Sequence, residues 1–160
     1  MSNLLIMNPK QQTVPFNVLL AEDDRDDRFF FNIALKEISI STELTTVYDG
    51  EELMMYLSEN LENLPDVIFL DINMPRKNGV ECLTEIRQSE KLKHLFVVIF
   101  STFYSRYNDF EEEAIKKIKS IGVDDFIRKP QDLLQLKEII QKVLLQGIDK
   151  KALKEQTNLI

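Results

Sequence analysis

The sequence predicts an α/β fold, a doubly wound sheet of five parallel strands with helices on both faces. Short apolar runs alternate with longer segments whose apolar residues have helical spacing, a pattern typical of parallel strands joined by right-handed helical crossovers. Some runs, such as residues 67–70 and 96–100, are apolar throughout, as expected for central strands covered on both faces. Several runs also end in a charged or hydroxyl side chain, which predicts a functional edge of the sheet.

The expected elements follow this alternation along the chain. The strands are expected at residues 16–21, 44–48, 67–70, 96–100 and 125–127. Four helices are predicted from apolar residues at helical spacing: Phe31, Ala34, Leu35 and Ile38; Val80, Leu83 and Ile86; Ala114, Ile115, Ile118 and Ile121; Leu133, Leu136, Ile140 and Val143. A further helix follows the Asp49-Gly50 turn, from Glu51 to about residue 57. Gly147 is expected to end the last helix.

The chain reads as one domain with two short extensions. Residues 1–15 are interrupted by Pro9 and Pro15 and are expected to form a loose arm. The apolar patch at residues 4–7 could instead dock on the body or on a second subunit, which leaves a homodimer possible. Residues 16–147 form the predicted domain, and residues 148–160 a charged tail of a helical turn or two.

Composition excludes several classes of function. The net charge of −7 argues against binding to nucleic acid and to anionic membranes. A single cysteine, Cys82, allows no intrachain disulfide, and no apolar segment or signal peptide directs the chain to a membrane, so a cytoplasmic protein is expected. With His94 as the only histidine, a zinc site with several histidines is ruled out.

Polar side chains at four strand ends predict one site. Glu22 and Asp23, Asp71, Ser101 and Lys129 follow the first, third, fourth and fifth strands, whose carboxyl ends converge in a doubly wound sheet. Three carboxylates in one place repel each other unless a cation binds them, and Mg²⁺ suits carboxylates and phosphate oxygens. The backbone carbonyl of Asn73 could complete the protein ligands. By contrast, Asp26 and Asp27 are assigned to the favourable interaction of acids with a helix N-terminus.

This set of groups suits phosphoryl transfer. An aspartate can attack phosphorus to give an acyl phosphate, and the reaction then requires mainly positioning and charge neutralisation. Lys129 offers a cation and Ser101 a hydroxyl donor for that purpose. Taken singly, Lys129 could equally pair with Asp125 at the surface, and Ser101 could cap a turn; their joint occurrence at strand ends favours a site.

These residues resemble the receiver domain of two-component response regulators, over about residues 16–146. VLLAEDD at residues 18–24 is similar to the acidic stretch of that family, FLDINMP at 69–75 to its phosphoacceptor stretch, and Lys129-Pro130 to its lysine and proline. The resemblance implies a flavodoxin-like strand order 2-1-3-4-5 and a cis peptide before Pro130. It also implies the site roles: Asp71 as phosphoacceptor, Ser101 and Phe126 as switch residues, and Glu22, Asp23, Asp71 and Asn73 as the metal site, with Asp23 a direct ligand.

The resemblance further implies a function and its partners. A histidine kinase or histidine phosphotransfer protein would donate the phosphoryl group to Asp71 with Mg²⁺, and a downstream protein would bind the altered surface. The tail after residue 147 is too short for an output domain, so a stand-alone regulator is expected, which phosphorylates and dephosphorylates itself rather than turning over a substrate. A binding module that works without phosphorylation stays an alternative. A phosphatase with an aspartate nucleophile is another, although such enzymes carry a second acid at the position of Asn73.

One stretch departs from the usual family pattern. The segment between Ser101 and Lys129 is longer than usual, and Phe103 is a bulky apolar residue where a hydrolytic water would approach. Phe103 is therefore expected to slow hydrolysis of the phosphorylated state, and Phe103→Glu to accelerate it. The aromatic residues Phe103, Tyr104 and Tyr107 and the last helix are candidate surfaces for a protein partner.

Overall fold

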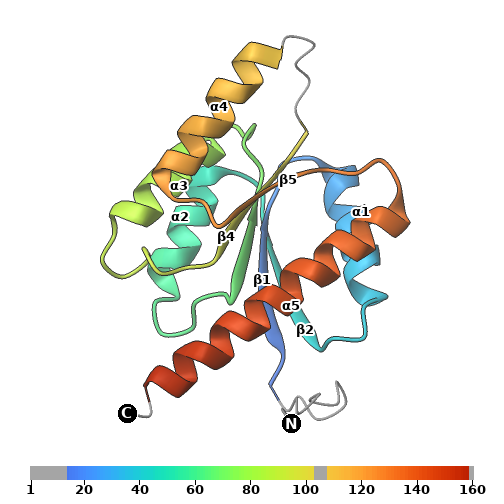
Figure 1. The fold of residues 1–160 in the computed structure, drawn as a ribbon, viewed down its shortest axis with the longest axis vertical. Coiled ribbons are helices and arrows are strands. Elements are labelled where there is room, and N and C mark those ends of the chain that lie inside the picture. The colour runs from blue at the N-terminus through green and yellow to red at the C-terminus, as the bar shows by residue number, and fades with distance from the viewer. Residues whose placement is uncertain (1–13, 103–107, 159–160) are drawn as a thin grey trace, which may run out of the picture.

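Within the residues that the structure describes, the chain forms a single parallel sheet of five strands in the order β2-β1-β3-β4-β5, flanked by five helices (Figure 1). The computed structural model describes residues 14–102 and 108–158. The strands are β1 (Phe16–Ala21), β2 (Thr42–Val47), β3 (Val67–Leu70), β4 (Val97–Ser101) and β5 (Asp125–Arg128). The helices are α1 (Arg25–Lys36), α2 (Gly50–Glu59), α3 (Gly79–Gln88), α4 (Asn108–Ile121) and α5 (Leu133–Thr157). The predicted fold class and strand order are confirmed.

Two apolar layers hold the sheet, one on each face. Side chains of α1 and α5 form one layer with Phe16, Phe69 and Phe100 of the sheet, and α2, α3 and α4 cover the opposite face (Figure 1). Every residue of β3 is fully buried, because alternate side chains of a central strand enter opposite layers. The strand that ends at Asp71 is therefore fixed from both sides.

Helix N-caps order the loops at the carboxyl edge of the sheet. Asp24, Asp49 and Asn78 follow β1, β2 and β3, and each side chain accepts a hydrogen bond from a backbone N–H in the first turn of the next helix. Such caps satisfy donors that the helix leaves unpaired. The same edge therefore carries three ordered helix starts beside the predicted site.

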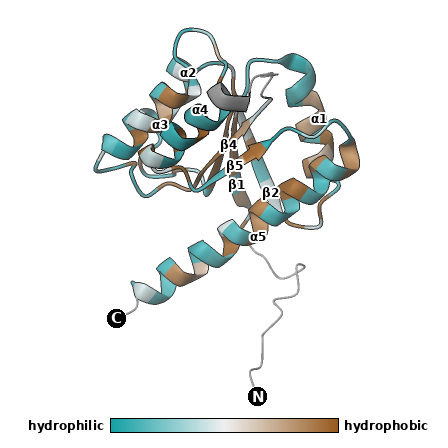
Figure 2. Cartoon of the chain, turned by 45° about the horizontal axis from the view of Figure 1, so that its top comes forward, coloured by the Kyte–Doolittle hydropathy of each residue, from teal (hydrophilic) through white to brown (hydrophobic). Residues whose placement is uncertain are grey.

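Helix α5 corrects one prediction, because it passes through Gly147 and continues to Thr157. Gly147 lies against the ring of Phe16, and a Cβ at this position would lie 2.6 Å from Phe16 Cζ. The glycine thus permits a close crossing of helix over sheet instead of ending the helix. Beyond it, Lys150 and Lys151 form ion pairs with Asp124 (3.0 Å) and Asp66 (3.2 Å), and the last turns project past the end of the sheet (Figure 2).

The predicted burial of two helix faces is only partly correct, and Leu133 of α5 is 38% exposed instead of buried. Of the apolar residues expected to be buried by α4, Ile118 is buried whereas Ala114, Ile115 and Ile121 are only partly covered. The N-terminal patch at residues 4–7 and the aromatic residues Phe103, Tyr104 and Tyr107 lie outside the described residues. Within the described ranges no helix combines the length and the apolar character needed to cross a membrane.

Candidate functional site

The carboxyl ends of four strands bring the predicted residues together. Glu22 and Asp71 continue β1 and β3 in the ladder, since the Glu22 N–H donates to Val47 O (3.0 Å) and the Asp71 N–H to Ala21 O (3.0 Å). Carboxylate oxygens of Glu22, Asp23 and Asp71 lie within 4.8 Å of one another. The predicted convergence of the first-strand acids on Asp71 is therefore present.

Asp71 is a buried carboxylate with two differently placed oxygens. Its Oδ1 accepts hydrogen bonds from Ser101 Oγ (2.7 Å) and from the Ile72 N–H (2.9 Å). Its Oδ2 lies 3.7 Å from Lys129 Nζ. Since Ser101 is fully buried at the end of β4, its hydroxyl fixes the orientation of the Asp71 side chain.

The loop after Asp71 is folded tightly against the start of α3. The Gly79 N–H donates to Ile72 O (2.8 Å), and a Cβ on Gly79 would lie 2.2 Å from the backbone oxygen of Asp71. Only a residue without a Cβ allows two backbone segments to approach this closely. Gly79 therefore keeps the loop that carries Asn73 next to Asp71.

Lys129 pairs with three acids at once. Its Nζ forms an ion pair with Glu22, lies 2.8 Å from Asp27 Oδ2 and faces Asp71. Although burial alone would lower the pKa of Lys129, its hydrogen bonds to Asp27 and Glu22 raise that pKa to about 12. Lys129 is therefore a cation at any physiological pH.

Asp27 is a site residue that the sequence analysis missed. Its sequence position predicts only an interaction with the helix dipole, and it does lie in the first turn of α1. However, Asp27 follows Asp23 by four residues, a spacing that can place two side chains on the same side of a helix start. That spacing was the available signal that Asp27 faces the same edge as Asp23.

Glu22 is a buried acid next to a second negative charge. Burial and, next, the charge of Asp71 raise the pKa of Glu22 to about 8, against the opposing effect of Lys129. Both causes penalise the ionised form. A divalent cation in this cluster would relieve the repulsion and favour the ionised carboxylate.

This pKa predicts how stability depends on pH in the absence of metal. From its ordinary value of 4.5 up to about 8, the unfolded chain loses the Glu22 proton while the folded chain keeps it. Rising pH therefore favours the unfolded chain, and the stability present below 4.5 is lost as pH passes through about 8. Relative to Glu22→Gln, the parent is expected to lose on the order of 2 to 4 kcal/mol of unfolding free energy between about pH 5 and about pH 8.

Urea unfolding of both proteins in EDTA measures this difference. Saturating Mg²⁺ should reduce the loss, because the cation favours the ionised form in the folded chain. A difference between parent and Glu22→Gln that stays constant with pH would contradict the predicted ionisation of Glu22.

The other predicted site residues differ in how far they are exposed to solvent. Asp23 and Asn73 are exposed to solvent. Phe126 is partly buried against the apolar layer under α2, α3 and α4. The Lys129–Pro130 peptide is trans, so the expected cis bond is wrong. The trans form is intrinsically favoured before proline by about 0.5–1 kcal/mol, and here it already places Lys129 among the acids. Phe103 lies outside the described residues.

Fold and site together define a class of protein, and comparisons with known proteins agree. The chain matches the family model of the response regulator receiver domain over residues 18–141. It therefore belongs to the response regulator receiver domain family.

Individual relatives support the same assignment. The response regulator Rcp1 of Synechocystis sp. is 32% identical over 133 residues, which cover 81% of this chain and 86% of that protein. The crystal structure of the phosphorylated cyanobacterial phytochrome response regulator RcpA has 33% identity and a TM-score of 0.70, covering 81% of this chain and 91% of that one. The Mn²⁺-bound form of Rcp1 has 29% identity and a TM-score of 0.68, with the same coverage. The acidic cluster of this chain likewise fits a divalent cation.

Proposed function

We propose that this chain is a phosphorylation-controlled receiver that takes a phosphoryl group on Asp71 from a histidine kinase or a histidine phosphotransfer protein. It then signals through a protein-binding surface that depends on phosphorylation. The observation that carries the proposal is the surroundings of Asp71, a buried carboxylate held by Ser101, faced by Lys129 and adjacent to the acids Glu22 and Asp23. Family membership supports the same reading.

The donor set fits Mg²⁺, a hard cation that prefers oxygen ligands. Glu22, Asp23 and Asp71 would hold it, with the backbone carbonyl of Asn73. The pKa of Glu22 is raised by burial first and by the charge of Asp71 second, and a cation would offset both. When bound, the ion would neutralise charge on the phosphoryl oxygens.

The chain's own residues account for the transfer. A carboxylate oxygen of Asp71 attacks the phosphorus of phosphohistidine, the P–N bond breaks, and its electron pair stays on the imidazole nitrogen. An acyl phosphate on Asp71 results. Lys129 stabilises the negative phosphoryl oxygens as a cation, and Ser101 can turn its hydroxyl from Asp71 Oδ1 toward them. Attack of water on phosphorus later releases inorganic phosphate and restores the carboxylate.

Output is proposed to occur through the face formed by α4, β5 and α5. A hollow of about 440 Å³ lies on this face, and its lining includes Ile115, Phe126 and Ile139. Arg128 at the end of β5 forms an ion pair with Glu111 of α4 across the same face. Movement of Ser101 toward a phosphoryl group would leave space behind it for the Phe126 side chain. Phosphorylation would therefore shift the population between two packings of the residues around this hollow.

The proposal is tested by incubating the chain with acetyl phosphate and Mg²⁺ and measuring its intact mass. We expect one phosphoryl group per chain, located on Asp71 by peptide mapping, with no adduct formed in EDTA. Absence of an adduct from both acetyl phosphate and a phosphorylated histidine phosphotransfer protein would instead indicate a binding module independent of phosphorylation. Continuous turnover of a phosphate ester would indicate a phosphatase.

A further inference from the structure

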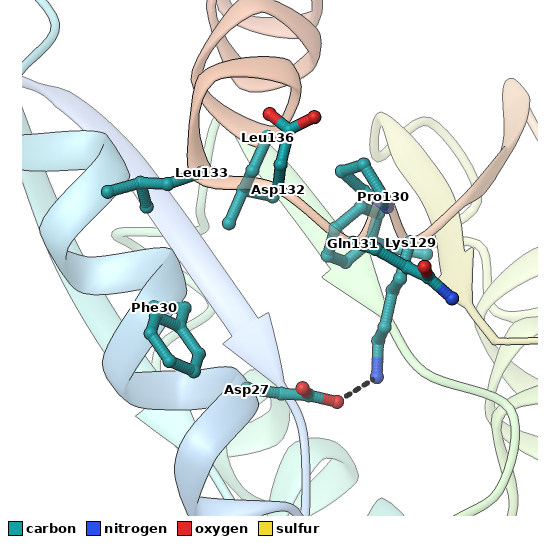
Figure 3. Close-up of a pocket in the computed structure, with 9 residues that line it drawn as sticks. Asp27, Phe30, Lys129, Pro130, Gln131, Asp132, Leu133 and Leu136 are labelled. Atoms are coloured by element: carbon teal, nitrogen blue, oxygen red, sulfur yellow. Dashed lines mark hydrogen bonds and ion pairs between the residues drawn. The ribbon is translucent and has the colours of Figure 1, made fainter.

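The contact between Asp27 and Lys129 joins helix α1 to the loop between β5 and α5. Figure 3 shows Asp27 pointing from α1 to the end of the Lys129 side chain, with Phe30 on the same helix and Pro130 at the other end of Lys129. These residues line a hollow of about 130 Å³ between the two segments. Asp27 Oδ2 lies 2.8 Å from Lys129 Nζ, whereas Asp71 Oδ2 lies 3.7 Å away. Lys129 is thus hydrogen-bonded to the helix acid and not to the phosphoacceptor.

The three acids around Lys129 differ in how much free energy is lost when their ion pair with Lys129 breaks. The side chains of Glu22 and Asp71 are 2% and 7% exposed, whereas that of Asp27 is 42% exposed. A buried carboxylate that loses its cation stays desolvated, which is costly. An exposed carboxylate is rehydrated by water, so breaking its ion pair costs little. Asp27 is therefore the acid that Lys129 can leave most easily.

We propose that Asp27 is a positioning residue that holds Lys129 away from Asp71 until a phosphoryl group arrives. This inference rests on the proposed function, because it concerns the lysine of the same site. A charge-assisted hydrogen bond to a phosphoryl oxygen requires a distance of about 2.7–2.9 Å, and the pairs with Glu22 and Asp27 hold the Lys129 ammonium where it now lies, 3.7 Å from Asp71 Oδ2. A shift of the ammonium toward the phosphoryl oxygen can keep its bond to buried Glu22 and weaken its bond to exposed Asp27. Asp27 therefore competes with the phosphoryl group for one ammonium.

This competition predicts the effect of removing the charge of Asp27. Asp27→Asn keeps the size of the side chain but weakens its bond to Lys129, so less is lost when Lys129 turns to a phosphoryl oxygen. Beryllofluoride, which imitates a phosphoryl group on aspartate, is expected to bind about threefold more tightly to Asp27→Asn than to the parent. Asp26→Asn is the matched control, because Asp26 is an exposed acid in the same first turn of α1.

The experiment is a beryllofluoride titration with saturating Mg²⁺, followed by ¹⁹F NMR, on the parent, Asp27→Asn and Asp26→Asn. A double-mutant cycle adds Lys129→Met alone and combined with Asp27→Asn. We expect tighter binding for Asp27→Asn only, and no gain from that change once Lys129 is absent. Equal affinities for the two asparagine variants would overturn the inference, and so would a gain that persists without Lys129. A parent that binds no beryllofluoride would refute the proposed function itself.

Discussion

Asp71→Asn is expected to abolish the phosphoryl adduct completely while the chain stays folded. The amide is neutral and a very weak nucleophile, so it does not attack phosphorus, but its oxygen can still accept the hydrogen bond from Ser101 Oγ. Removing this charge also takes away one of the causes that raise the pKa of Glu22. We therefore expect the unfolding free energy to rise or to stay within about 1 kcal/mol of the parent. Intact mass after incubation with acetyl phosphate and Mg²⁺, together with urea unfolding, measures both effects.

Asp149→Asn is the matched control for this experiment. It makes the same chemical change at an exposed position of α5, outside the carboxyl edge of the sheet. This variant should accept the phosphoryl group at the parental rate. An adduct on Asp71→Asn that equals the parent's would place the phosphoacceptor elsewhere in the chain.

Gly79→Ala is expected to destabilise the chain by more than about 3 kcal/mol. Alanine normally stabilises a helix relative to glycine, so local propensity predicts the opposite sign. Here the added Cβ would lie 2.2 Å from the backbone oxygen of Asp71 and 2.9 Å from Ile72 Cα. Backbone atoms cannot rotate away as a side chain can, so the loop after β3 must shift. Urea unfolding measures the loss of stability.

A second effect of Gly79→Ala should follow at the site. The shift moves the backbone of Asp71, so phosphorylation by acetyl phosphate should slow even in the folded fraction of the variant. Gln88→Ala, at the exposed last residue of α3, is the control and should stay within about 0.5 kcal/mol of the parent. A stability gain for Gly79→Ala would show that the loop accommodates a methyl group.

Strand ends were the part of the site that the sequence could predict. An apolar run such as β3 is buried on both faces, so the first polar residue after it marks the edge of the sheet. Asp71, Ser101 and the acids after β1 are all found by this rule, and parallel pairing brings them together regardless of the loops between them. The same rule gives the fold class, since alternation of strands and helices determines the topology.

Residues whose role depends on contacts between distant segments escaped prediction. Asp27 resembles an ordinary helix-start acid, and only its distance to Lys129 shows its second role. Gly147 resembles a helix end, because the sequence does not reveal that Phe16 lies beneath it. The isomer of the peptide before Pro130 likewise depends on the path of the chain between β5 and α5.

The length of α5 bears on where a working fragment of this protein can be cut. The family match stops at residue 141, yet Val143 and Leu144 are buried in the layer between α5 and the sheet. Farther along, Lys150 and Lys151 bind acids beside β5 and β3 at the end of the sheet opposite Asp71. A fragment trimmed to the shared family boundary would expose apolar surface and discard these two anchors. The minimal cooperative unit of this chain therefore includes most of α5.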